Sequence, residues 1–240
     1  MRNDGRSNLA LREITIKKDF LKYAEGSCLI EAGNTKVICS ASVEDGVPPF
    51  LRDKGVGWVT AEYGMLPRSC RSRIARDSSR FKTSGRSQEI QRLIGRSLRS
   101  VVNMSALGER TIWLDCDVLQ GDGGTRAASV TGAFVALAEA LKKIRKDDLI
   151  KNIPLNDYVA SVSVGIINGK IMLDLVYEED SKAEVDMNIV MTGSGKLIEV
   201  QGTAEGKPFT KTDMDNMLEV AKGGIEKLVK KQKQILKLEI

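Results

Sequence analysis

Hydrophobic and polar residues alternate from Thr111 to Leu119, which is the period of a β-strand with one buried face. A turn with three glycines follows at residues 121–124, and small and apolar residues then run from Ala127 to Leu141 without a proline. This run predicts a buried α-helix. The middle of the chain is therefore predicted to be a strand, a glycine-rich turn and a helix.

Further strands and helices are predicted on both sides of this unit. Alternation and turn signals predict strands at residues 14–17, 28–32, 35–43, 55–63, 158–166, 170–176, 184–192 and 196–203. Ile90, Leu93 and Ile94 begin an apolar face at helical spacing, which predicts a helix up to about residue 101. Residues 212–237 predict a long helix with Thr212 and Asp213 as candidates for its N-cap.

These elements indicate an α+β protein with two packed halves. Residues 147–157, which include Pro154, form the only plausible connector between the halves. We therefore expect one half at residues 1–147 and the other at residues 158–240. The second half begins with a hairpin, as the first does.

The glycine-rich turn is a candidate anion site. The first N–H groups of the following helix lack acceptors and lie at the positive end of the helix dipole, an arrangement that binds anions. Thr125 adds a hydroxyl and Arg126 a forked cation, which suits phosphate. The glycines could instead make only a tight connection, but the dipole disfavours Arg126 unless an anion lies beside it. Arg86 stands at the start of another predicted helix, so the two arginines could hold one phosphate.

Composition narrows the chemistry available to the chain. It has 240 residues, of which 42% are hydrophobic and 29% charged, as in ordinary globular proteins. No apolar run approaches the length of a membrane span and the N-terminus lacks the apolar core of a signal peptide, so we expect a cytoplasmic protein. The four cysteines show no CxxC spacing and are expected to be reduced. The absence of histidine excludes Ser-His-Asp and Cys-His catalysis and histidine-ligated zinc.

Positive charge is concentrated in one segment. Residues 66–99 contain nine arginines and Lys82 against only Asp77 and Glu89, a local charge of +8, whereas the whole chain carries +5. Such a cationic segment favours a polyanionic partner bound at one place. A solvated charged loop is the alternative, although such loops usually mix both signs.

Carboxylates cluster in the second half. Glu178, Glu179, Asp180, Glu184 and Asp186 lie within nine residues. Most acidic clusters are solvated turns, but Asp180 and Asp186 are expected at the end of one strand and the beginning of the next, so both could face one pocket. Beside phosphate-binding arginines, such carboxylates would suit Mg²⁺. Cations that hold phosphate and a metal that neutralises a phosphodiester are what phosphoryl transfer needs.

Five separated motifs span almost the whole chain. They are Met1-Arg2-x-Asp4-Gly5-Arg6, the stretch from Glu89 to Arg99, Gly123-Gly124-Thr125-Arg126, Asp180-Ser181-x-Ala183-x-x-Asp186-Met187-Asn188, and the stretch from Glu199 to Gly206. Together they resemble the bacterial ribonuclease PH family. The resemblance implies a phosphate-dependent 3′→5′ exoribonuclease that trims tRNA precursors, can act on ribosomal RNA, and releases nucleoside diphosphates reversibly.

The resemblance also implies an architecture and roles for individual residues. It implies two packed βαβα-type halves of the ribosomal protein S5 domain 2-like fold, assembled as a homohexameric ring, a trimer of dimers. Phosphate would be bound by Arg86, Gly124, Thr125 and Arg126, and a divalent metal by the catalytic pair Asp180 and Asp186. Candidates for RNA contact are arginines of the cationic segment, namely Arg68, Arg73 and Arg76 in the loop and Arg92, Arg96 and Arg99 on the helix.

Two other functions compete with this one. A catalytically silent RNA-binding ring subunit is disfavoured by the presence of Arg126 and of the Asp180/Asp186 pair. A small-molecule kinase with related βαβα units is disfavoured because the chain has no GxxxxGK[ST] loop. The loop at residues 69–83 departs from the usual family pattern, which bears on RNA preference and leaves the catalytic groups in place.

Overall fold

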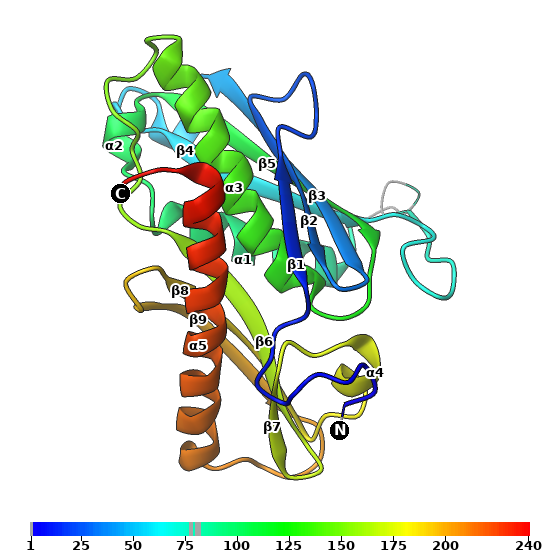
Figure 1. Ribbon diagram of the computed structural model, residues 1–240. Helices are drawn as coiled ribbons and strands as arrows, with labels where there is room; N and C mark the ends of the chain where they lie inside the picture. Colours follow the sequence, from blue (N-terminus) through cyan, green and yellow to red (C-terminus); the bar gives the residue numbers. More distant parts are fainter. Residues whose placement is uncertain (1, 77–78, 80–82) are drawn as a thin grey trace.

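The computed structural model describes residues 2–76, 79 and 83–240. Asp77, Arg80 and Lys82 of the cationic segment therefore lie outside the described residues. The fold has two sheets, and Figure 1 shows them one above the other with helices packed alongside. This arrangement confirms the predicted mixture of helices and strands in two groups. None of the described helices is long and apolar enough to cross a membrane.

The first sheet has five strands in the order β1-β2-β3-β5-β4. Its strands are β1 (Ile14–Lys18), β2 (Gly26–Ala32), β3 (Thr35–Asp45), β4 (Trp58–Met65) and β5 (Arg110–Gln120). Strands β4 and β5 pair in parallel, whereas the other neighbours are antiparallel. A parallel pair needs a crossover connection, and here it contains the cationic segment, α1 (Gly85–Arg99) and α2 (Met104–Leu107). The short helix η1 (Pro49–Leu51) precedes β4.

The second sheet has four antiparallel strands in the order β7-β6-β8-β9. Its strands are β6 (Val159–Ile167), β7 (Lys170–Leu173), β8 (Val185–Thr192) and β9 (Leu197–Ala204). Strand β7 ends at Leu173, three residues earlier than predicted, because Asp174 takes a left-handed backbone conformation with φ of 56°. The short helix α4 (Tyr177–Asp180) then leads toward β8.

Helix α3 (Thr125–Lys146) packs against both sheets and contributes to one continuous core. Gly132 allows it to approach the first sheet, since a Cβ there would lie 2.8 Å from both Cys39 Sγ and Ile30 Cγ2. On the other side, Ser161 of β6 donates its N–H to Thr131 Oγ1 (3.2 Å). Because this core is shared, the division at residues 147 and 158 remains a prediction.

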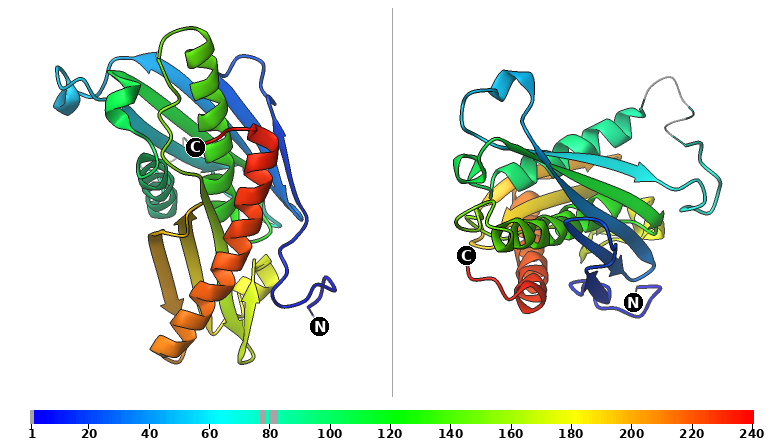
Figure 2. Two further views of the ribbon diagram at one scale, coloured as in Figure 1. Left: turned by 60° about the vertical axis from the view of Figure 1, so that its left-hand side comes forward. Right: turned by 90° about the horizontal axis from the view of Figure 1, so that it is seen from above.

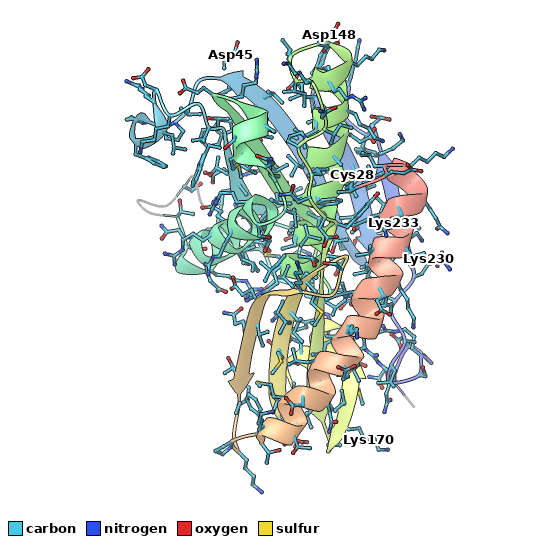
Figure 3. All side chains as sticks on the ribbon, turned by 90° about the vertical axis from the view of Figure 1, so that its left-hand side faces the viewer. Cys28, Asp45, Asp148, Lys170, Lys230 and Lys233 are labelled. Atoms are coloured by element: carbon cyan, nitrogen blue, oxygen red, sulfur yellow. The ribbon has the colours of Figure 1, made fainter. Side chains whose placement is uncertain are left out.

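Helix α5 (Lys211–Leu236) lies along the second sheet and reaches the first half with its C-terminal end (Figure 2). Its N-cap is Thr210 rather than Thr212, because the Thr210 hydroxyl accepts the Asp213 N–H while Asp213 accepts the Thr210 N–H in return. Lys230 and Lys233 are both exposed toward the C-terminal end of this helix (Figure 3). Cys28, Cys39 and Cys116 are buried, and all four cysteines are free, as predicted.

Candidate active site

The glycine-rich turn brings the start of α3 to the boundary between the two halves. Gly123 and Gly124 have φ of 75° and 65°, which glycine adopts readily. No side chain caps the helix, so its first N–H groups and the positive end of its dipole remain available to an anion. The Thr125 hydroxyl is buried and lies 2.9 Å from the Tyr63 hydroxyl of β4, which fixes its position.

Arg126 is held by two side chains from different elements. Its Nη1 donates to Glu89 Oε1 of α1 (2.9 Å) and also to Gln201 Oε1 of β9. Gln201 in turn donates to the same Glu89 oxygen (2.9 Å). The negative charge of Glu89 thus partly offsets the unfavourable interaction between Arg126 and the positive end of the helix dipole.

Arg86 occupies the second residue of α1, as predicted, and its side chain is exposed. It makes no hydrogen bond or ion pair with any residue that the structure describes. Its charge nevertheless opposes the rise in the pKa of Asp180, as does the charge of Arg126. Arg86, Arg126 and Asp180 are therefore close enough to share one electrostatic environment.

The two predicted metal carboxylates also lie together. Asp180 is the last residue of α4 rather than the end of a strand, and Asp186 is the second residue of β8. The pKa of Asp186 is raised to about 6, first by burial and then by the charge of the neighbouring Asp180, against the lowering effect of Arg126. Glu205, beyond the end of β9, contributes in the same direction. Burial raises the pKa of both carboxyls, so each carries a negative charge at a cost in free energy that a bound cation would reduce.

The donor set fits a divalent cation. Asp186 Oδ1 is buried and has no geometrically defined hydrogen-bond partner among the described residues, and Oδ2 accepts a long bond from Asn188 (3.4 Å). No group of three or more acidic, cysteine or histidine residues suited to a metal occurs in the described part of the chain. Mg²⁺ commonly takes one or two carboxylates and fills its remaining positions with water and substrate oxygens.

Replacing Asp186 by asparagine should stabilise the metal-free protein at neutral pH. The carboxyl titrates near 3.8 when unfolded and at about 6 when folded, so the folded state loses stability as pH rises between these values. Above pH 6 the full cost is present, and its removal should raise the free energy of unfolding by about 1–2 kcal/mol after solvent screening. Urea denaturation with a chelator at pH 7.5 and pH 4.5 measures this.

The gain should shrink at pH 4.5, where the folded carboxyl is already protonated. Glu219→Gln, an exposed change on α5, serves as the control and should alter stability little at either pH. A loss of stability in Asp186→Asn at pH 7.5 would contradict the prediction.

The predicted RNA-contact arginines fall into two groups. Arg68, Arg73 and Arg76 are exposed in the loop after β4, and Arg92 is exposed on α1. Two helix arginines have partners within the chain. Arg96 pairs with Glu199 of β9 (3.3 Å), and Arg99 lies over the Trp58 ring and donates to the Val59 carbonyl (2.9 Å). Contact of these residues with RNA remains a prediction.

Four residues at the site were not anticipated from the sequence. Tyr63, Glu89 and Gln201 hold Thr125 or Arg126, and Arg12 donates to the carbonyls of the glycine-rich turn. Glu89 and Gln201 stand within motifs that resemble the family, which is the one signal that marked them. Tyr63 and Arg12 had no such signal, because only the fold brings them to the turn.

Comparison with known proteins places this site in a family. Residues 10–143 match the model of the 3′ exoribonuclease family, domain 1, and residues 157–224 match that of domain 2. The chain is 60% identical over 236 residues to the protein named ribonuclease PH of Moorella thermoacetica, covering 98% of this chain and 94% of that protein. It is 59% identical over 237 residues to the protein of that name from Bacillus subtilis, covering 98% and 97%.

Solved structures share the fold. A chain of the Archaeoglobus fulgidus exosome with RNA bound to the active site has a TM-score of 0.81 at 23% identity, covering 96% of this chain and 92% of that one. A chain of an archaeal exosome core has a TM-score of 0.77 at 24% identity, covering 97% and 91%. These likenesses confirm the S5 domain 2-like fold.

The class that the fold and the site define is therefore that of enzymes that degrade RNA from its 3′ end. The chain belongs to the ribonuclease PH family of 3′ exoribonucleases. It is a phosphate-dependent 3′→5′ exoribonuclease, with inorganic phosphate as co-substrate and RNA as substrate.

Proposed function

We propose that the enzyme trims the 3′ ends of tRNA precursors, and of ribosomal RNA, in the cytoplasm. An oxygen of inorganic phosphate attacks the phosphorus of the terminal phosphodiester, and the bond from this phosphorus to the 3′ oxygen of the preceding nucleotide breaks. The terminal nucleotide is released as a nucleoside diphosphate, the shortened RNA keeps a 3′ hydroxyl, and the reverse reaction adds nucleotides. The observation that supports this best is the convergence of Arg86, Arg126 and Asp180 at the boundary of the halves, because it joins a site for phosphate to a site for metal.

In this proposal each side chain has a separate task. Arg86, Thr125, Arg126 and the Gly124 backbone hold the attacking phosphate, while the loop and helix arginines bind the RNA backbone. Two like charges about 4 Å apart repel by roughly 4 kcal/mol at an effective dielectric near 20, and the arginines offset this repulsion. Asp180 and Asp186 hold Mg²⁺, which when bound stabilises charge on the reacting phosphodiester.

Because Arg68, Arg73 and Arg76 would contact phosphates rather than bases, RNA binding should be salt-sensitive and weakly selective for sequence. We further propose a homohexamer arranged as a trimer of dimers, as the resemblance implies. Sizing of the purified protein by mass tests this assembly.

The direct test supplies unprocessed tRNA and Mg²⁺ with and without inorganic phosphate. We expect nucleoside diphosphates and a shortened 3′ end only when phosphate is present, and extension of the RNA when nucleoside diphosphates are supplied in excess. Nucleoside monophosphates released without phosphate would contradict the proposal, because they would indicate hydrolysis. An RNA that is bound but never shortened would instead favour a silent ring subunit.

A further inference from the structure

The N-terminal segment of the chain is joined to the connection between β7 and β8. Figure 1 shows this segment beside α4, and Leu173 donates its N–H to the Asn8 carbonyl (2.8 Å). The motif that contains Arg2 and Arg6 lies here, and it has no part in the function described so far. Arg2 and Arg12 are both buried, with 5% and 6% of their surface exposed. A buried arginine is costly unless it is fully paired, so its partners indicate what it does.

Arg12 forms a forked ion pair with Asp174. Its Nη2 donates to Asp174 Oδ1 (2.6 Å), and its Nε and backbone N–H donate to Oδ2 (3.0 and 2.8 Å). Burial by itself would raise the pKa of Asp174, but the hydrogen bonds and charge of Arg12, with the charge of Arg6, hold it below its usual value. Asp174 is therefore a buried carboxylate that stays charged and ties the first half to the second.

The other side of the Arg12 guanidinium holds the glycine-rich turn. Nη1 donates to the Asp122 carbonyl (2.7 Å), and the Thr35 hydroxyl donates to the Gly123 carbonyl (2.7 Å). In a trans peptide the N–H points opposite to the C=O of the same unit. With both carbonyls held on this side, the N–H groups of Gly123 and Gly124 are turned to the opposite side.

Arg2 holds the connection between β7 and α4, which leads to Asp180. It donates to the carbonyls of Leu173 (2.7 Å) and Asp174 (2.9 Å), and its Nε donates to Glu179 Oε1 (2.8 Å). Glu179 also accepts the N–H of Val176 (3.0 Å), which caps α4. The next residue is Asp180, so the Arg2–Glu179 pair sets the position of one of the two carboxylates.

The turn and this connection are in direct contact. A Cβ on Gly123 would lie 2.4 Å from the Leu175 carbonyl and 2.8 Å from the Tyr177 nitrogen. The turn that leads into Thr125 and Arg126 therefore contacts the backbone segment that leads to Asp180. Arg12 bonds to both sides of this contact, to the turn and to Asp174.

We propose that Arg12 and Asp174, together with Arg2 and Glu179, are positioning residues for the reaction. They hold the phosphate-binding groups of the turn at a fixed place relative to Asp180. This inference rests on the proposed function of the turn and of Asp180. A small displacement between reacting groups can cost a large factor in rate, which gives the three buried charges and the partly buried Glu179 a role in the reaction.

The test separates positioning from stability with four variants of the full chain: Arg12→Met, Asp174→Leu, the double variant and Arg12→Lys. Arg12→Met leaves the buried Asp174 with only its longer ion pair to Arg6 (3.4 Å) and should destabilise the protein, whereas the double variant removes both members of the Arg12–Asp174 pair and should recover stability. We expect the double variant nevertheless to show a KM for phosphate raised about tenfold or more, because the carbonyls of the turn are no longer held. The KM for RNA should stay within about twofold of wild type.

Arg12→Lys keeps the charge, but one ammonium cannot bridge Asp174 and two carbonyls. It should therefore also raise the KM for phosphate. Lys142→Met is the matched control, since it breaks the Lys142–Glu139 pair toward the far end of α3 (2.8 Å) and should lower stability without changing the KM for phosphate. A wild-type KM for phosphate in the folded double variant or in Arg12→Lys would overturn the inference.

A second measurement tests the other pair and covers the case in which the Arg12 variants do not fold. Glu179→Gln should raise the Mg²⁺ concentration for half-maximal activity about tenfold, whereas Glu178→Gln, its exposed neighbour, should not. An unchanged Mg²⁺ requirement in Glu179→Gln would contradict its positioning role. If wild-type protein releases nucleoside diphosphates while these variants behave as wild type, this inference fails and the proposed function stands.

Discussion

Replacing Arg126 by alanine is expected to lower phosphate-dependent release of nucleoside diphosphates by about 10²–10³-fold. The substitution removes a partly buried cation from the start of α3, where 14% of its side chain is exposed. It also leaves the Glu89 carboxylate without its partner at the place where phosphate would bind, which adds repulsion. Initial rates over a range of phosphate concentrations, with tRNA precursor in excess, measure the effect.

Arg145→Ala is the matched control for this substitution, because Arg145 is exposed near the other end of the same helix. Its rate should equal that of wild type. Binding of tRNA by Arg126→Ala should be largely intact, since the arginines proposed to contact RNA lie in the loop and on α1. Unchanged release at saturating phosphate would remove Arg126 from the proposed phosphate site.

Replacing Asp180 by asparagine is expected to lower the rate by about a thousandfold at saturating phosphate, equivalent to ~4 kcal/mol of transition-state stabilisation. The variant retains the shape of the side chain and loses half of the paired negative charge that would attract Mg²⁺. The Mg²⁺ concentration for half-maximal activity should rise at the same time. A titration of activity with Mg²⁺ measures both effects.

Glu219→Gln again provides a control, since it removes one negative charge from the exposed face of α5. Its Mg²⁺ titration should match that of wild type. If Asp180→Asn kept both the wild-type rate and the wild-type titration, the carboxylate pair would have no part in binding the metal.

The fold follows from patterns that are local in the sequence. The apolar run after residue 126 predicted α3 because a helix buried on most of its surface requires small and apolar residues all around it, and 17 of its 22 residues are buried. The strand predicted at residues 170–176 was too long because its end is determined by a contact between residues distant in the sequence. Its end depends on the left-handed backbone of Asp174, which is stabilised by Arg12, 162 residues away.

The sequence was sufficient to predict the charged residues of the site, but not the contacts that these residues make with one another. A glycine turn before a helix, and carboxylates in one motif, pointed to phosphate and metal. The helix dipole predicts an anion beside Arg126, but Glu89 already supplies a negative charge there from within the protein. That pairing depends on α1, α3 and β9 meeting at one point, and no spacing along the chain contains this information.

The crossover between β4 and β5 has a consequence for which changes to this loop the fold accepts. The parallel pairing of these strands requires a connection of sufficient length, which contains α1. At its start the Ser69 carbonyl accepts the Gly121 N–H (2.8 Å), which joins the loop to the glycine-rich turn. We therefore expect a loop exchange that keeps residues 66–69 to leave the turn in place, whereas an exchange that displaces Ser69 should also move the proposed phosphate site.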